Sequence, residues 1–139
     1  MKNLLSILFL FCSIAAFGKI KQTVHQTFTL EDATQTLYLD LVGDYEIEPW
    51  PSNSIMSETK IELYDASPHV LNYFMEKEER YKINQSDPGS TITLSAHDKA
   101  RKEIKYKDAD CFELVKLKIY VPDSFEIVDN RTLKKKTTD

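Results

Sequence analysis

Apolar residues recur at every second position along most of this chain, the spacing of a β-strand with one buried face. In the clearest run, residues 55–64, one face carries Ile55, Ser57, Thr59, Ile61 and Leu63, and the other carries Met56, Glu58, Lys60, Glu62 and Tyr64. Shorter runs of the same kind cover residues 24–30, 37–41, 45–49, 81–83, 92–94, 104–106, 115–121 and 125–127. The alternation predicts a mainly β fold.

Turn-forming residues separate these runs. Gly, Pro, Asp, Asn or Ser occur at residues 31–33, 42–44, 49–53, 87–89 and 122–124. The resulting spacing predicts about eight to ten short strands, arranged as a β-sandwich, a roll or a short β-solenoid. The pattern leaves open whether the strands run parallel, as a solenoid needs, or antiparallel, as a sandwich needs.

One segment breaks the strand period. Ser67 is suited to cap a helix and Pro68 to its first turn. The apolar residues that follow fall on one helical stripe, namely Val70, Leu71, Phe74 and Met75. This pattern predicts one α-helix at about residues 68–79, inserted between strands and covering one end or face of the sheet.

The first 18 residues have the composition of a cleaved export signal. Lys2 precedes an apolar run at residues 4–17, and Ala16, Phe17 and Gly18 provide small residues where a signal peptidase needs them. A membrane anchor is the weaker interpretation because the run is shorter than about 20 residues. Lipid attachment at Cys12 is also weaker, since no small residue directly precedes it. We therefore predict a periplasmic or secreted protein with no stable membrane insertion after cleavage.

Cleavage leaves one predicted domain at residues 19–130, followed by a basic, disordered tail at residues 131–139. Cys111 becomes the only cysteine, which predicts a half-buried structural thiol and no internal disulfide. The full chain has 18 Lys and Arg residues and 22 Asp and Glu residues, a net charge of −4. An acidic body argues against nucleic acid as a partner.

The sequence contains no recognisable catalytic or metal-binding motif. His25, His69 and His97 are far apart, and none lies in a zinc-ligand frame. Two carboxylate-rich stretches, residues 40–48 and 108–113, lack the spacing of a calcium loop, so we interpret them as solvated strand faces. We predict no catalytic residue, no metal site and no cofactor.

The remaining candidates for ligand contact are aromatic. Trp50 lies between Pro49 and Pro51 at a predicted bend, with Tyr45 and Glu48 shortly before it. Exposed aromatic rings beside carboxylates hold sugars in many extracellular modules, because a ring face suits C–H groups and a carboxylate accepts hydroxyls. Trp50, Tyr45 and Glu48 are therefore our candidate binding residues. A core or turn-filling role for Trp50 is the alternative.

Two segments resemble a known family. Residues 41–50 contain Gly43-Asp44-x-x-Ile47-x-x-Trp50, and residues 112–122 end in Tyr120-Val121-Pro122. Both are similar to strand units of adhesin-type β domains exported by Bacteroidota, of the auto-transporter adhesin head type. The resemblance covers roughly residues 24–130 and implies a solenoid or roll of β-strands. It supplies no catalytic residues, and this chain departs from it through the inserted helix.

Three classes of function fit these patterns. The first is a non-enzymatic, adhesin-like module of the cell envelope or surface that binds a protein, glycan or lipid. The second is an extracellular hydrolase or lyase with an unrecognised site, whose mark would be a cleft with carboxyl groups of raised pKa or a His paired with a carboxylate. The third is an inhibitor or chaperone that pairs an edge strand with a client. We expect the first.

Overall fold

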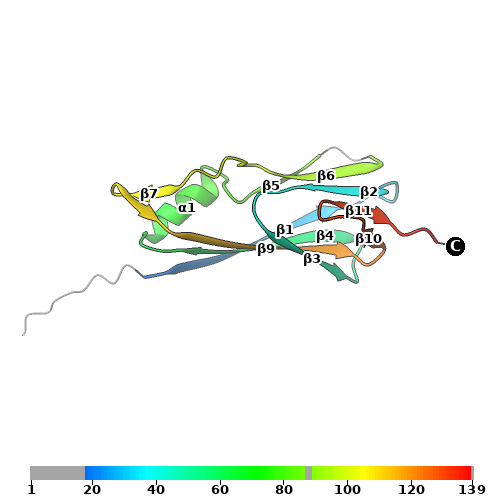
Figure 1. Ribbon diagram of the computed structural model, residues 1–139, viewed down its shortest axis with the longest axis horizontal. Helices are drawn as coiled ribbons and strands as arrows, with labels where there is room; N and C mark the ends of the chain where they lie inside the picture. Colours follow the sequence, from blue (N-terminus) through cyan, green and yellow to red (C-terminus); the bar gives the residue numbers. More distant parts are fainter. Residues whose placement is uncertain (1–17, 87–88, 139) are drawn as a thin grey trace, which may run out of the picture.

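The computed structural model describes residues 18–86 and 89–138 of the protein. Two β-sheets lie face to face, with a helix and a small hairpin at one end of the molecule (Figure 1). The predicted mainly β fold with one inserted helix is confirmed. Apart from Gly18, the predicted export signal lies outside the described residues.

The first sheet, sheet A, has the strand order β1-β4-β9-β3. Its strands are β1 (Ile20–Thr29), β4 (Ser54–Leu63), β9 (Glu113–Pro122) and β3 (Tyr45–Trp50). The pairs β1/β4 and β4/β9 are antiparallel, whereas β3 runs parallel to β9. β3 continues through Pro49, which was expected in a turn, because an edge strand tolerates a residue that lacks an N–H donor.

The second sheet, sheet B, has the strand order β10-β11-β2-β6-β5. Its strands are β10 (Phe125–Ile127), β11 (Thr132–Lys135), β2 (Thr36–Asp40), β6 (Thr91–Ala96) and β5 (Ile83–Gln85). Only the β2/β6 pair is parallel. Both sheets are therefore mixed, and each contains parallel and antiparallel pairs.

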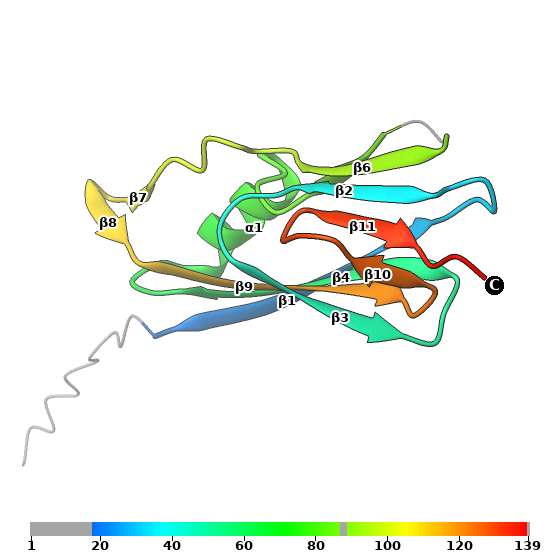
Figure 2. The same ribbon diagram turned by 45° about the vertical axis from the view of Figure 1, so that its right-hand side comes forward.

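The helix α1 (Pro68–Glu76) and the hairpin of β7 (Ile104–Tyr106) and β8 (Ala109–Cys111) occupy the end where sheet A extends beyond sheet B (Figure 2). The helix is shorter than predicted because the chain leaves it through Glu79, whose φ of 48° is left-handed. No helix in the described part of the chain is long and apolar enough to cross a membrane.

The interior has two apolar clusters. The larger one lies between the sheets and contains fully buried residues such as Leu37, Ile55 and Ile119. The smaller one lies under α1, where Leu71 packs with residues of β4 and of the β7/β8 hairpin, including Cys111. Cys111 is a free, buried thiol, so the packing of these clusters holds the described fold together without a disulfide.

The alternation predicted for residues 55–64 is confirmed by β4. Ile55, Ile61 and Leu63 are at most 1% exposed and face the interior. Ser57 and Thr59 share that face and lie between the two clusters along the strand, also buried. Ser57 Oγ has no hydrogen-bond partner among the described residues.

Side-chain amides connect the two sheets along one flank. Gln26 of β1 accepts a hydrogen bond from Ile83 N at 2.9 Å and donates one to Ile83 O at 3.2 Å. Gln85 of β5 donates to Thr29 O at 2.9 Å. These bonds provide partners for backbone groups at the facing edges of β1 and β5, as a neighbouring strand would.

The prediction of a disordered tail at residues 131–139 is wrong for residues 132–135. Residues 132–135 form β11, which lies between β10 and β2 in sheet B. Leu133 is 1% exposed and belongs to the larger apolar cluster, and this burial outweighs the charge of the neighbouring lysines. The predicted boundary at residue 130 therefore falls inside the domain.

We expect Leu133→Ala to lower the free energy of unfolding by about 2–5 kcal/mol, since it removes a buried side chain from the core. The matched control Lys134→Ala changes an exposed residue and should stay within about 0.5 kcal/mol of wild type. Urea unfolding followed by circular dichroism measures both. Equal stability of Leu133→Ala and wild type would contradict the placement of β11.

Candidate functional site

The three candidate binding residues all lie on β3, but they divide between its two faces. Glu48 and Trp50 point to the outer face of sheet A, and Glu48 lies opposite Tyr120 of β9 in the strand register. Tyr45 instead packs against the larger apolar cluster, and its hydroxyl donates to Asn130 O. The structure therefore keeps Trp50 and Glu48 together and removes Tyr45 from the candidate site.

Two residues that the sequence did not single out complete this region. The Tyr120 ring lies 5.8 Å from that of Trp50, at 46°. Lys118 Nζ lies 3.2 Å from a Glu48 carboxylate oxygen and 5.8 Å from the centre of the Tyr120 ring. Trp50, Tyr120, Glu48 and Lys118 form what we call the aromatic corner. Both rings are half-buried, so part of each meets solvent.

Local bonds fix the orientation of the Trp50 ring. Its Nε1 donates to Ser54 O at 2.8 Å, across the turn that joins β3 to β4. Ser52 Oγ accepts from Ser54 N at 3.2 Å within the same turn. The indole therefore supports the turn, as one sequence interpretation predicted, and also holds its exposed part in a defined position. Such preorganisation reduces the entropy lost when a ligand binds.

The rest of the outer face of sheet A is charged but largely paired. Glu62 lies 3.5 Å from Lys19 and 3.7 Å from Lys21. Glu58 lies 3.3 Å from His25 and 3.5 Å from Lys60. Exposed pairs of this kind contribute little to stability. Two ring pairs border this face of mixed charge, Trp50 with Tyr120 in the aromatic corner and Tyr64 with Phe112 at the other end of sheet A.

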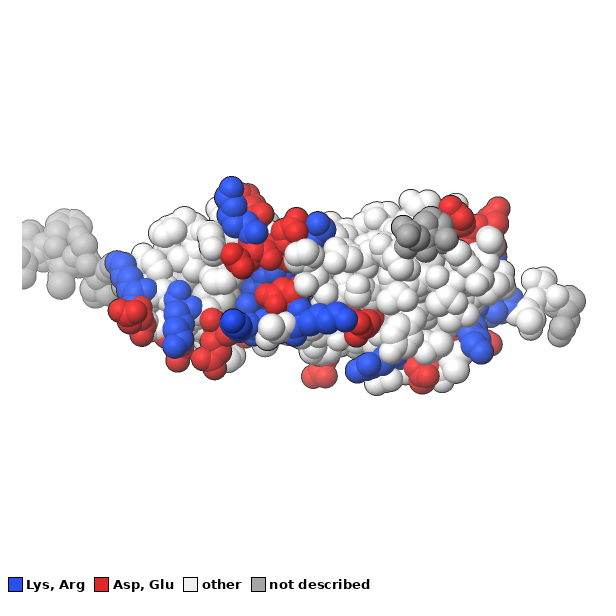
Figure 3. Space-filling model, turned by 90° about the horizontal axis from the view of Figure 1, so that it is seen from above, with Lys and Arg blue, Asp and Glu red and all other residues white. Residues whose placement is uncertain are grey.

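The outer face of sheet B has a different character. Its β2 and β6 positions carry mainly hydroxyl side chains, namely Thr36, Tyr38, Thr91, Thr93 and Ser95. Viewed from this side, charged side chains gather toward the helical end, while much of the rest of the surface is uncharged (Figure 3). Alternation along the strands produces this face, because Leu37, Leu39, Ile92 and Leu94 all point inward.

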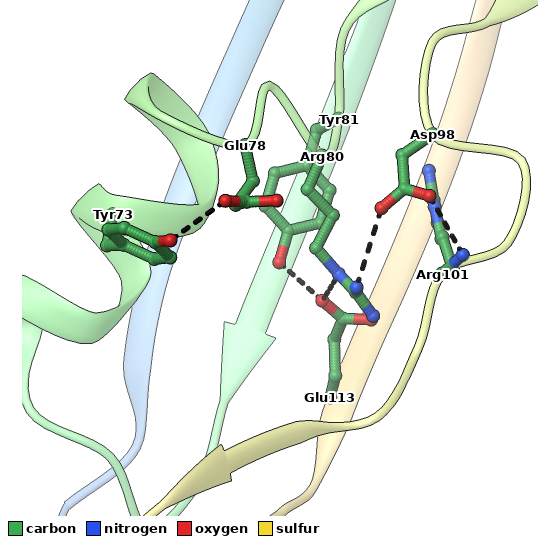
Figure 4. A network of polar contacts seen from close by, with 7 residues as sticks. All are labelled: Tyr73, Glu78, Arg80, Tyr81, Asp98, Arg101 and Glu113. Carbon is green, nitrogen blue, oxygen red and sulfur yellow. Dashed lines mark hydrogen bonds and ion pairs between the residues drawn. The ribbon is translucent and has the colours of Figure 1, made fainter.

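A buried polar network lies where the chain leaves α1 (Figure 4). Arg80, only 4% exposed, donates to both carboxylate oxygens of Glu113, through Nε at 3.0 Å and Nη2 at 3.1 Å. The Tyr81 hydroxyl donates to the same carboxylate. Asp98, in the loop after β6, lies 3.8 Å from Arg80 Nη1. The network joins the end of α1 to the first residue of β9 and to sheet B.

The chemistry of this network fits a structural role. Burial, followed by the hydrogen bond to Glu113, raises the pKa of the Tyr81 phenol, so it stays protonated. Arg101 lies with its guanidinium 5.6 Å from the centre of the Tyr81 ring, and burial lowers the pKa of that guanidinium. The Glu113 carboxylate accepts three hydrogen bonds, two from Arg80 and one from Tyr81, as expected of a group that holds a buried guanidinium in place.

Two histidines lie beside carboxylates, the arrangement named above as a mark of an enzyme. His25 is 3.3 Å from Glu58, and His97 is 3.3 Å from Glu79. Hydrogen bonds, chiefly from His25 to Glu58 and from Lys82 to Glu79, lower the pKa of both carboxyl groups. Both pairs lie on the surface. A lowered carboxyl pKa is the reverse of what a general acid requires.

The candidate calcium stretches do not converge. Across residues 18–86 and 89–138, no three His, Cys, Asp or Glu side chains come close enough to hold a metal ion. Glu113, from the second stretch, points inward to Arg80 instead of lying on a solvated face as predicted. Its side chain is 15% exposed. The inward direction follows from its position on β9, where Val115, Leu117 and Ile119 share its face.

Comparison with known proteins adds no relationship. No family model matches the chain, and no curated protein or solved structure matches it either. The resemblance to adhesin-type domains therefore rests on the sequence motifs alone.

We expect Glu113→Gln to lower the free energy of unfolding by about 3–5 kcal/mol, because it removes the carboxylate that pairs with two nitrogens of the buried Arg80 guanidinium and leaves only Asp98, 3.8 Å away. Glu103→Gln, at an exposed carboxylate in the loop before β7, is the matched control and should have little effect. Thermal and urea unfolding measure both variants. A Glu113→Gln protein as stable as wild type would show that the ion pair is dispensable.

The raised pKa of Tyr81 predicts a loss of stability in alkali. The folded state holds this proton more tightly than the unfolded state, so the contribution is complete below about pH 10 and is lost as the pH rises further. We expect Tyr81→Phe to cost about 1 kcal/mol near neutral pH and to lose less stability than wild type above about pH 10.

Urea unfolding at a series of pH values measures this difference. Tyr73→Phe is the control, since Tyr73 is 50% exposed and also donates to a carboxylate, Glu78. Tyr73→Phe should change the dependence of the unfolding free energy on pH above about pH 10 less than Tyr81→Phe does. If wild type and Tyr81→Phe lost stability equally between about pH 10 and higher pH, the raised pKa of Tyr81 would be contradicted.

Proposed function

We propose that this protein is an exported, non-enzymatic binding module of the cell envelope or surface, and that its ligand contacts the aromatic corner on the outer face of sheet A. The observation that carries the proposal is the pairing of Trp50 with Tyr120 beside the Glu48–Lys118 ion pair. Large aromatic side chains next to polar groups are characteristic of binding sites.

The state of the ionisable groups supports a binding role over catalysis. Among residues 18–86 and 89–138, the carboxyl groups with a displaced pKa are those of Glu58, Glu62, Glu79 and Asp129, and hydrogen bonds lower the pKa of each. The carboxylate of Glu113, whose side chain is 15% exposed, accepts three hydrogen bonds from Arg80 and Tyr81. A hydrolase or lyase needs a carboxyl group of raised pKa to act as an acid, whereas the pKa values of Glu58, Glu62, Glu79 and Asp129 are lowered.

Two measurements test the proposal. Fractionation of producing cells should recover the chain, without its first 18 residues, in the periplasm, at the surface or in the medium. The purified mature protein should bind envelope fractions of those cells, and the double change Trp50→Ala with Tyr120→Ala should weaken binding at least about tenfold.

Phe112→Ala provides the control for the binding assay. Phe112 is 64% exposed and lies beside Tyr64, at the end of sheet A away from the aromatic corner. This variant should bind as wild type does. Cytoplasmic recovery, or equal binding by the double variant and wild type, would overturn the proposal.

A further inference from the structure

We infer that the aromatic corner recognises a neutral oligosaccharide. This inference rests on the proposed function and specifies its ligand. The corner combines two partly exposed aromatic rings with one carboxylate and one ammonium group, all on adjacent strands β3 and β9. Saccharide rings present C–H faces that pack on aromatic rings and hydroxyls that exchange hydrogen bonds with charged side chains.

The relative orientation of the rings favours a chain of sugars over a single one. Trp50 and Tyr120 are 5.8 Å apart and inclined by 46°, so their surfaces are not coplanar. Consecutive sugar units of an oligosaccharide are turned relative to each other, and each can therefore contact a different ring. One sugar unit cannot lie flat on both rings at once.

The charge of the corner favours a neutral ligand. Glu48 and Lys118 lie 3.2 Å apart and cancel each other. The nearby hydrogen bond from Lys118 to Glu48 raises the pKa of the lysine, which therefore stays cationic. Lys118 would attract an anionic sugar and Glu48 would repel it, whereas a cationic sugar would be attracted by Glu48 and repelled by Lys118. Hydroxyls can donate to the carboxylate and accept from the ammonium group.

The position of aliphatic groups argues against a lipid at this site. Within the described part of the chain, the large hydrophobic side chains most exposed to solvent are Tyr73, Phe112, Leu114, Ile127 and Val128. None of them belongs to the corner, whose apolar surface is aromatic and bordered by an ion pair. An acyl chain would gain most from a continuous aliphatic surface, and the corner does not provide one.

Trp50 is the only tryptophan in the chain, so its fluorescence reports on this site alone. The probes are three neutral hexasaccharides, cellohexaose, maltohexaose and chitohexaose, titrated into the mature protein. At least one should give a saturable change in emission. Tyr120→Ala, which keeps the reporter, should weaken that affinity at least about tenfold, and Glu48→Gln should weaken it severalfold. Trp50→Phe is measured by calorimetry.

Phe112→Ala is again the matched control and should leave the affinity unchanged. The affinity should also be the same in about 50 mM and about 500 mM NaCl, because an uncharged ligand is not screened by salt. Circular dichroism confirms that each variant is folded. Binding of none of the three probes, equal loss in Phe112→Ala and Tyr120→Ala, or binding that disappears in high salt would each overturn the inference.

The envelope-binding assay distinguishes failure of the oligosaccharide inference from failure of the proposed function. If the mature protein binds envelope through Trp50 and Tyr120 but ignores the oligosaccharides, the ligand class is wrong and the binding module stands. If the protein binds neither, both proposals fall.

Discussion

The structure depends on a mismatch of length between its two sheets. Three strands of sheet A have ten residues each, whereas the longest strand of sheet B has six. Sheet B therefore covers only part of the apolar inner face of sheet A. Ile61 and Leu63 of β4 lie beyond that part, and α1 with the β7/β8 hairpin covers them. The helix is thus required by the sheet, since without it a row of core side chains would meet water.

The Arg80–Glu113 pair lies at the junction that this arrangement creates. It fixes the point where the chain turns from α1 toward β5 and sheet B, and it uses a bidentate geometry that a lysine could not provide. Removal of two charges from water is costly, and the additional donor from Tyr81 offsets part of that cost. These three hydrogen bonds to Glu113 join the end of α1 to β9.

Strand faces could be predicted from the sequence where alternation was long, as in β4, and the helix was evident from its apolar stripe. β11 could not be predicted, because a single leucine among lysines does not form an alternating apolar pattern. The sequence could have shown that Tyr45 and Glu48 point to opposite faces of a strand, since they are an odd number of positions apart. The Trp50–Tyr120 contact could not be predicted from the sequence, because it depends on the register between β3 and β9, and these two residues are seventy positions apart in the chain.

The position of β11 inside sheet B, between β10 and β2, affects the order in which the protein can assemble. Sheet B joins β2, near the start of the domain, to the last described strand, and β10 reaches the sheet only through β11. A chain that emerges from a ribosome or a membrane pore with its N-terminus first cannot complete this sheet until residues 132–135 have appeared. Because β2 and β11 are far apart in the chain, their pairing is a long-range contact, and such contacts form slowly; sheet B is therefore expected to close late in folding.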